Sequence, residues 1–430
     1  MRVHQADVKE VLRSSATVSE SMSIDGWTTV RLGDPDVATN IMGQSPASST
    51  YNKEGIGLPF FQGKIDFGLR HPRPSTWCSS PLKIAEAGDI LISVRAPVGD
   101  VNIAVERCCI GRGISALRPG SKVFNEFLFY LLLHHKPDLD ALGTGATFKA
   151  INKNTLYSFE IQLPPFLEQR AIAAVLSKIQ AAVEVQEKIV ATLKELKAAT
   201  MAKLFREGLR GELLKQTEIG EIPGSWGVAR LDALANLLSG GTPSKRRPEW
   251  WQGTIPWVSP KDMKQPRLWD AQDHITEDAL ENGSCLVPTK TVFVVIRGMI
   301  LAKDLPVAIT EVPMAFNQDI KAVLTRESVD PDYLLYAIAS RKGALVREIG
   351  TSAHGTRRMG TSSLEALLLP LPAKVEQREI AAAMRCLEQR EETASKKLCH
   401  LRLVFSSMLH LLMTGQVRVK SVASALGANP

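Results

Sequence analysis

The residues most able to do chemistry are lysines and arginines grouped in loops. The segment GGTPSKRRPEWW (240–251) places three cations between two prolines and beside two tryptophans. Cations in a loop can reach phosphate oxygens or base edges without disturbing a core. An ordinary solvated surface loop is the alternative. We therefore treat Lys245, Arg246 and Arg247, together with Lys261 further along, as candidate nucleic-acid contacts.

Other basic residues lie beside turns or small-residue loops in both halves of the chain. Such loops, GTGAT (143–147) and GTSAHGT (350–356), offer backbone N–H groups suited to phosphate oxygens. Arg95 ends a strand expected to be buried, so a structural role is its alternative. The remaining candidate contacts are Arg70, Arg73, Arg95, Lys149, Arg357 and Arg358.

No catalytic motif accompanies these cations. The sequence contains no phosphate-binding loop, zinc-protease helix, nucleophile elbow or dinucleotide fingerprint, and no Asn-Pro-Pro-aromatic motif of a base-flipping methyltransferase. Its six cysteines show no metal-binding spacing and are expected to be reduced, mostly buried thiols. We expect no catalytic residues, no cofactor and no metal site.

The composition is that of a globular protein with a basic balance. Lys and Arg number 52 against 45 Asp and Glu, which gives a net charge of +7 and favours a polyanionic partner without proving one. No secretory signal is visible at the N-terminus, and no apolar run approaches the ~18 residues that a membrane span needs. We expect a cytoplasmic protein with no membrane partner.

The elements that must position these residues occur twice. The motif LPPFLEQRAI (163–172) returns as LPAKVEQREI (371–380), and each copy opens a long amphipathic helix. A mixed α/β segment, beginning at Trp27 or Trp226, precedes each copy. The order of strands, short helix and small-residue loop is the same in both segments. The sequence therefore predicts an α+β protein with two pseudo-repeated α/β heads separated by two long antiparallel coiled-coil helices.

This pattern gives explicit boundaries. Strands are expected near 90–95 and 101–105 in the first head and near 291–297 and 306–310 in the second, and short helices at 126–133 and 331–338. The expected segments are a lead-in (1–26), head 1 (27–163), a central helix (164–215), head 2 (216–371), a C-terminal helix (372–420) and a tail (421–430).

The long helices carry apolar residues at alternating spacings of four and three, as in a coiled coil. Polar residues interrupt the two seams at different places, which favours one pairing register. Near its end the first seam meets Lys197 and Thr200, and we expect Leu196 to replace them. Two surface helices, each packed on its own head, are the alternative. The principal seam residues are Ile172, Ile179, Leu193, Ile380, Leu387 and Leu401.

The duplicated motifs, with GDILISVRAPVG (88–99) and FNQDIKA (316–322), resemble the specificity subunit of type I restriction-modification systems. The resemblance covers residues 27 to about 419. It implies a non-catalytic reader of double-stranded DNA in which each head, a target-recognition domain, reads one half of a bipartite, asymmetric target. It also implies that the helices set the spacer and dock two modification (methyltransferase) subunits, which restriction (ATP-dependent translocase and endonuclease) subunits then join.

Two other functions fit parts of the pattern. A protein-protein adaptor with two heads on a coiled-coil spacer would need no DNA, although the matched cationic loops argue against it. A self-sufficient modification enzyme would need the cofactor and base-flipping motifs that the sequence lacks.

Overall fold

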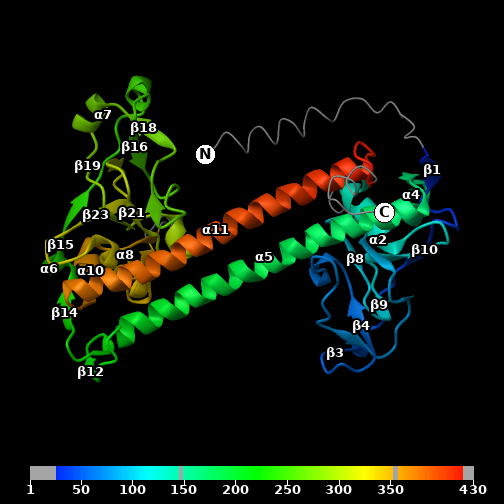
Figure 1. Cartoon of the computed structure of the whole chain (residues 1–430), viewed down its shortest axis with the longest axis horizontal. Helices are drawn as coiled ribbons and strands as arrows, with labels where there is room; N and C mark the ends of the chain where they lie inside the picture. Colours follow the sequence, from blue (N-terminus) through cyan, green and yellow to red (C-terminus); the bar gives the residue numbers. More distant parts are fainter. Residues whose placement is uncertain (1–25, 145–148, 352–356, 420–430) are drawn as a thin grey trace. The chain divides into compact units, whose positions relative to one another are not determined.

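The computed structural model describes residues 26–144, 149–351 and 357–419 (Figure 1). The chain divides into two compact units: unit 1 comprises Met1–Val185 and Leu398–Pro430, and unit 2 comprises Gln186–Lys397. Each unit holds one head and a part of both long helices. The lead-in up to residue 25, the tail from residue 420, and most of the two small-residue loops lie outside the described residues.

Head 1 is built on a four-stranded antiparallel sheet in the order β2-β10-β7-β8. Strand β7 is buried along its whole length because both faces of this sheet are covered. Ile90 and Ile92 face the core formed with helix α2, whereas Leu91 faces a second sheet in the order β3-β5-β4-β9-β6. Bounds are β2 (Ala38–Met42), β3 (Tyr51–Asn52), β4 (Leu58–Phe61), β5 (Trp77–Cys78), β6 (Ile84–Ala85), β7 (Ile90–Ser93), β8 (Val101–Ile103), β9 (Cys108–Ile110), β10 (Ile114–Pro119) and α2 (Asn125–His134).

Head 2 repeats this arrangement. Its main sheet has the order β15-β23-β20-β21-β17, helix α8 packs on it, and its second sheet has the order β18-β16-β22-β19. Helix α8 begins at a side-chain cap, because Asp330 accepts a hydrogen bond from the Tyr333 N–H. Bounds are β15 (Ala235–Ser239), β16 (Ile255–Val258), β17 (Arg267–Leu268), β18 (Asp273–Ile275), β19 (Leu286–Val287), β20 (Val292–Val295), β21 (Val307–Thr310), β22 (Met314–Phe316), β23 (Ile320–Thr325) and α8 (Pro331–Ser340).

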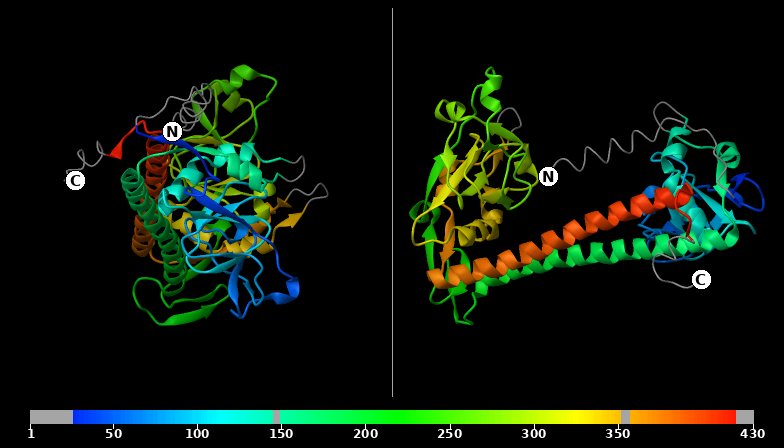
Figure 2. Two further views of the ribbon diagram at one scale, coloured as in Figure 1. Left: turned by 90° about the vertical axis from the view of Figure 1, so that its right-hand side faces the viewer. Right: turned by 45° about the horizontal axis from the view of Figure 1, so that its top comes forward.

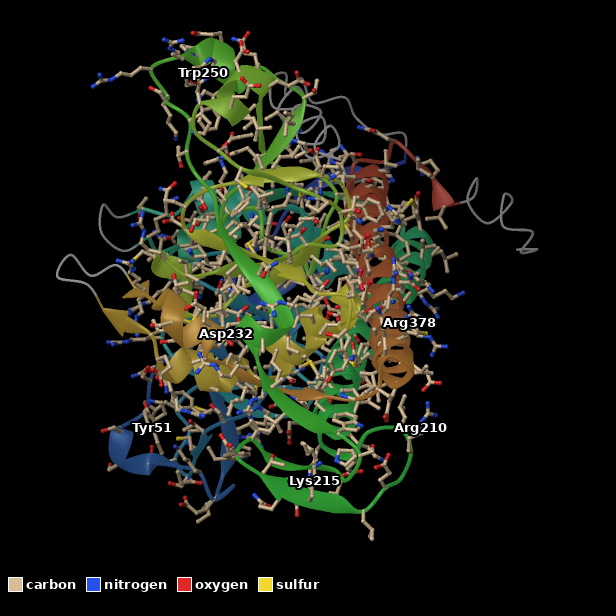
Figure 3. All side chains as sticks on the ribbon, turned by 90° about the vertical axis from the view of Figure 1, so that its left-hand side faces the viewer. Tyr51, Arg210, Lys215, Asp232, Trp250 and Arg378 are labelled. Atoms are coloured by element: carbon tan, nitrogen blue, oxygen red, sulfur yellow. The ribbon has the colours of Figure 1, made fainter. Side chains whose placement is uncertain are left out.

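Smaller elements complete the heads. In each head the first strand pairs antiparallel with the strand that precedes the long helix, β1 with β11 and β14 with β26. After α5, unit 2 adds the hairpin β12–β13, on which Lys215 lies (Figure 3). Bounds are β1 (Thr28–Arg31), β11 (Glu160–Leu163), α3 (Lys136–Ala141), α4 (Lys153–Ser158), β12 (Leu214–Thr217), β13 (Gly220–Pro223), β14 (Gly227–Arg230), α6 (Leu231–Leu234), α7 (Glu277–Glu281), α9 (Lys342–Arg347), β24 (Gly350–Thr351), β25 (Arg357–Arg358), α10 (Thr361–Glu365) and β26 (Leu368–Leu371); the 3-10 turns are η1 (Ser48–Thr50), η2 (Lys64–Asp66), η3 (Pro248–Trp251) and η4 (Met299–Ala302).

The expected duplication is thus confirmed in the main sheets, although their edges differ by one strand, and the four expected strands are observed as β7, β8, β20 and β21. The thiol expectation is right for three cysteines: Cys78, Cys108 and Cys109 are buried. It is wrong for Cys386 and Cys399, which are exposed because they lie on the outer face of the second long helix.

The two long helices are α5 (Phe166–Glu207) and α11 (Lys374–Met413). Both are shorter than the expected spans of 164–215 and 372–420. Gly208 follows α5 with a φ of +62°, a left-handed conformation that ends helices readily because glycine has no Cβ. Gly415, with a φ of +66°, lies just beyond α11. Among the described residues, neither these helices nor any other is long and apolar enough to cross a membrane.

Within each unit, α5 and α11 lie side by side and antiparallel (Figures 1 and 2). In unit 1, Ile172 and Leu176 near the start of α5 share a core with Leu412 at the end of α11. In unit 2, Gln186 donates a hydrogen bond to the Ala394 carbonyl at 3.0 Å, and just beyond the end of α5 Arg210 pairs with Glu379 of α11. The alternative of two unpaired surface helices is therefore wrong.

The seam residues face inward as expected, with one correction. Ile172 and Ile380 are fully buried, and the other four, Ile179, Leu193, Leu387 and Leu401, are partly buried. Leu196, however, does not replace Lys197: Leu196 is 48% exposed. Lys197 keeps its seam position because its ammonium pairs with Glu391, the polar interruption of the other helix, at 2.5 Å.

A glutamine fastens the start of each long helix to its head. Gln169 accepts a hydrogen bond from the Phe124 N–H and donates to two carbonyls, those of Lys122 and Pro164. Gln377 makes the same three bonds in unit 2, accepting from the Asp330 N–H and donating to the carbonyls of Ser328 and Pro372. This explains physically why the Glu-Gln-Arg motif occurs twice: the buried amide satisfies backbone groups that lead into the short helix.

Candidate nucleic-acid interface

Four backbone segments meet at one edge of head 1, and we call this edge the rim of head 1: residues 43–46, 94–96, 111–113 and 149–151. The Gln44 N–H donates to the Ile110 carbonyl at 3.0 Å, and the Val94 N–H donates to the Gly113 carbonyl at 2.9 Å. Residues 149–151 close the edge through the Ala96 N–H, which donates to the Lys149 carbonyl at 3.0 Å.

Head 2 forms the same rim from residues 240–243, 296–298, 317–319 and 357–359. The Gly241 N–H donates to the Phe316 carbonyl at 2.9 Å, the Ile296 N–H to the Asp319 carbonyl at 2.8 Å, and the Gly298 N–H to the Arg357 carbonyl at 3.0 Å. A Cβ at Gly43 or at Gly240 would come within 2.2 Å of a facing carbonyl oxygen, so both first segments need glycine.

The rim brings together cations that are far apart in the sequence. Arg95 and Lys149 lie on adjacent rim segments of head 1, since residue 95 pairs with residue 150 in an isolated β-bridge. Arg297 and Arg358 are joined by the equivalent bridge in head 2, next to Arg357. Arg95, Arg357 and Arg358 are exposed. For Arg95 the backbone has a structural role, because residue 95 pairs with residue 150 on the rim. Its side chain is exposed to solvent.

The predicted cationic loop 240–251, which we call the finger, extends from the rim of head 2. Figure 3 shows its residue Trp250 on a protruding part of this head. Lys245, Arg246 and Arg247 are all exposed. The Lys245 ammonium lies 5.8 Å from the centroid of the Trp251 ring, and the Arg247 guanidinium carbon lies 4.8 Å from that of Trp250. Both distances are those of cation–π interactions.

A small core holds the finger in place. The Trp251 and Trp257 rings meet edge to face with centroids 5.0 Å apart, and Trp250 packs against the same cluster as Ile275. The indole N–H of Trp257 donates to the Gly241 carbonyl at 3.0 Å, and that of Trp251 donates to the Ser244 carbonyl at 3.3 Å. The tryptophans therefore serve both as anchors of the loop and as platforms for its cations.

Arg70 does not lie on the rim. Its guanidinium pairs with Glu126 near the start of α2, and its side chain is 18% exposed. Arg267 makes the corresponding contact in head 2, to Asp332 near the start of α8 at 2.7 Å. We call each of these pairs a buttress. Sequence reasoning placed Arg70 among the DNA contacts, but the structure uses its charge inside head 1.

The buttress of head 2 is more elaborate. Arg267 also pairs with Glu311 at 2.6 Å and with Glu388 of α11 at 3.3 Å, and donates to the Tyr336 hydroxyl at 3.2 Å. Burial alone would raise the pKa of Asp332 and Glu311, but hydrogen bonds from Arg267 and Lys290 outweigh it and lower both pKa values. Burial raises the pKa of Glu388 despite the same arginine.

The remaining candidates lie apart from the finger. Arg73 is exposed on the loop between η2 and β5. Lys261 pairs with Asp273 at 2.7 Å, beside the second sheet of head 2, and Lys149 pairs with Asp140 at 3.1 Å. These two lysines are about half exposed and their charges are partly compensated.

Sequence reasoning missed the rim as a unit. It grouped Arg112, which is exposed on the third segment of the head 1 rim, with the basic residues of head 1 but did not place it among the candidate contacts. It also missed the tryptophan platforms. The spacing of the tryptophans from the three cations was a usable signal, whereas the meeting of four separate segments depends on strand pairing that no local pattern reports.

Comparisons with known proteins agree with this architecture. Residues 24–195 and 223–399 match the family described as "Type I restriction modification DNA specificity domain". The "Putative type I restriction enzyme MjaX specificity subunit" of Methanocaldococcus jannaschii is 47% identical over 187 residues, which cover 43% of this chain and 44% of that protein. The chain thus spans less than half the length of this curated relative.

Solved structures show the same fold over nearly the whole chain. The crystal structure of a type I restriction-modification system S subunit from M. genitalium gives a TM-score of 0.63 at 16% identity and covers 92% of this chain and 98% of that one. A second structure, of a type I R-M system, gives 0.55 at 16% identity with 90% and 98% covered. With the family matched twice, once across each head and into the following helix, the chain belongs to the type I restriction modification DNA specificity domain family.

Proposed function

We propose that this chain is the DNA-recognition subunit of a type I restriction-modification complex, without catalytic residues of its own. Each head reads one half of a bipartite target. The observation that carries this proposal is the rim: the same four backbone segments meet in both heads, and each rim displays a different set of cations. Because the side chains differ, the two half-sites differ, and the target is asymmetric.

The chemistry of the exposed cations favours DNA over a protein partner. Arg guanidinium groups bind phosphates and the O6/N7 edge of guanine with paired hydrogen bonds. Arg95, Arg112, Arg357 and Arg358 supply such groups on the rims, and the finger adds three more cations. A protein-protein adaptor gives no reason for matched cationic rims in both heads, so we place it second.

Two modification subunits are the proposed protein partners, joined by restriction subunits. Equivalent contacts fasten α5 to head 1 and α11 to head 2, so one chain presents two similar surfaces. A pseudo-twofold chain of this kind can hold two copies of one partner. Those partner subunits would then bind the methyl donor and ATP, and this chain would need no cofactor of its own.

We further propose that α5 and α11 set the length of the unread spacer between the half-sites. Inserting about four residues within 180–200 moves the following residues along the helix by about 6 Å. The preferred spacer should change before folding is lost. An unaltered spacer in an insertion variant that still folds would count against this role.

Methylome sequencing of cells with and without this gene, each carrying the modification gene, tests the central proposal. We expect a bipartite, non-palindromic methyladenine motif that disappears when this gene is deleted. If no motif depends on the gene, salt-dependent duplex binding by the purified complex decides. Absence of duplex binding would overturn the proposal.

A further inference from the structure

The three cations of the finger are adjacent in sequence but differ in their surroundings. Arg247 lies over the Trp250 ring, Lys245 lies over the Trp251 ring at a longer distance, and no aromatic ring of the described residues lies under Arg246. The rings hold Arg247 and Lys245 in one orientation, whereas the Arg246 side chain has no such support.

Trp250 is a fixed platform. Two hydrogen bonds fix its backbone. The Trp250 N–H donates to the Arg247 carbonyl at 3.1 Å, and the Trp250 carbonyl accepts from the Thr276 N–H at 3.0 Å. The ring packs against the core that contains Trp257 and Ile275. A guanidinium resting on this ring is therefore oriented before any ligand arrives.

An oriented guanidinium suits base reading better than phosphate binding. Guanine presents two acceptors, O6 and N7, in the major groove, and a planar guanidinium with free donors can bond both at once. Phosphate oxygens accept from many directions and need no fixed donor plane, so a mobile cation serves them equally well. Among the described residues, no carboxylate pairs with the Arg247 guanidinium, which leaves its donors available.

We propose that Arg247, held by Trp250, is a specificity-determining residue that reads a guanine in the half-site of head 2, while Arg246 binds backbone phosphate. This inference rests on the proposed DNA-reading function. It assigns the two arginines different roles, although both are exposed and carry the same charge.

The test compares Arg247→Lys with the matched control Arg246→Lys. Both variants keep the charge but replace the planar, ring-supported pair of guanidinium donors by one flexible ammonium, and both sites are exposed, so neither should unfold head 2. The full chain, assembled with its modification subunits, selects from a duplex library with two randomised half-sites, and the bound DNA is sequenced. Thermal melting verifies that the variants fold as the wild type does.

For Arg247→Lys we expect one position of one half-site to lose its guanine preference by about tenfold or more, the usual cost of a lost paired contact. The other half-site should be unchanged, and Arg246→Lys should leave both unchanged. Retention of the full motif by Arg247→Lys would overturn the assignment, as would the same loss in Arg246→Lys or a wild-type motif without guanine in the affected half-site. If the wild-type complex enriches no motif, the DNA-reading function itself fails.

Discussion

The two heads share a backbone frame and differ in the loop that leaves its rim. Both loops start alike, with GQSP (43–46) in head 1 and GGTP (240–243) in head 2. Head 1 continues with ASSTY (47–51), which carries no charge, whereas head 2 continues into the finger with three cations and two tryptophans. The frame is fixed by backbone hydrogen bonds and by the glycines at 43 and 240, so the side chains of the loop beyond them can change without cost to the fold. Reading chemistry therefore differs between the heads while the fold does not.

The two buttresses also differ between the heads, in the number of carboxylates that the arginine pairs with. Arg70 of head 1 has one carboxylate partner among the described residues, Glu126. Arg267 of head 2 joins Asp332, Glu311 and Glu388, of which the last lies on α11. An arginine that pairs with several buried carboxylates must contribute more to stability than one that pairs with a single carboxylate, Glu126, which is 32% exposed.

The largest expected effect therefore follows removal of the buttresses. Arg267→Ala leaves three poorly exposed carboxylates with fewer partners and should destabilise head 2 by about 3–5 kcal/mol. Arg70→Ala should cost head 1 about 1–2 kcal/mol, because Glu126 can still reach water. Amide hydrogen exchange in α8 and α2 measures the two losses separately, with Arg246→Ala as an exposed control. Equal losses in both heads would contradict the comparison.

Removal of the finger charges should have the next largest effect. Replacing Lys245, Arg246 and Arg247 by alanine should lower target affinity about a hundredfold at moderate salt. It should also reduce the slope of log K against log salt by up to ~2, since Arg247 is proposed to read a base and each of the other two cations can contribute ~0.9 as a phosphate contact. Fluorescence anisotropy over a salt series measures both. Lys396→Ala, which removes a helix cation paired with Glu392, is the control. An unchanged slope would remove the finger from the interface.

Acidification to pH 5 should destabilise unit 1 more than unit 2. His134 ends α2, and burial, with His135 and His410 nearby, lowers its pKa to about 4 despite the opposing effect of Asp138. An unfolded histidine titrates near 6.5, so unfolding takes up a proton below that pH. Unit 1 should lose about 2 kcal/mol by pH 5, and the loss should continue toward pH 4. Ser340 ends the equivalent helix α8 and cannot titrate.

Urea denaturation at pH 7 and pH 5 checks this effect. His134→Ser should flatten the pH dependence of unit 1, whereas His400→Ser, an exposed histidine on α11, should leave it as in the wild type. Two carboxylates of the head 2 buttress, Asp332 and Glu311, act in a lower window: their depressed pKa values stabilise unit 2 above about pH 4, and this is lost only below it. Equal acid sensitivity of both units above pH 4.5 would exclude the histidine as its cause.

The sequence predicted most of the fold because its signals were repeated. Two copies of one motif located the helices, and the seam spacing identified the residues that face inward. It misjudged Leu196 and did not foresee the ion pair of Arg70 for one reason: in each case the charged partner lies far away in the sequence. Lys197 stays on the seam because it pairs with Glu391, and Arg70 turns inward because it pairs with Glu126. The finger was found because its cations are consecutive, whereas the rim, assembled from four segments, left no local pattern.

The seam itself offers the smallest and most discriminating comparison. The polar pair Lys197 and Glu391 in unit 2 occupies repeat positions that are filled in unit 1 by Phe405 and Val183, both apolar. Exposed or half-buried ion pairs stabilise little, so reversing both charges should change stability by less than about 1 kcal/mol. Either reversal alone puts two like charges on the seam and should cost about 1–2 kcal/mol, and the double-mutant cycle measures their coupling.

Replacing the same pair by leucines separates stability from register. The apolar variant should be as stable as the wild type or more so, because a partly buried ion pair is often no better than apolar packing. It should nevertheless lose the preference for one alignment of α5 and α11. In the wild type a shifted alignment would place Lys197 and Glu391 against apolar residues, and the leucine variant removes that cost. Cross-linking between cysteines placed on the two helices measures the alignments present, and light scattering measures dimers. A single alignment in the leucine variant would show that the heads, and not the Lys197–Glu391 pair, fix the register.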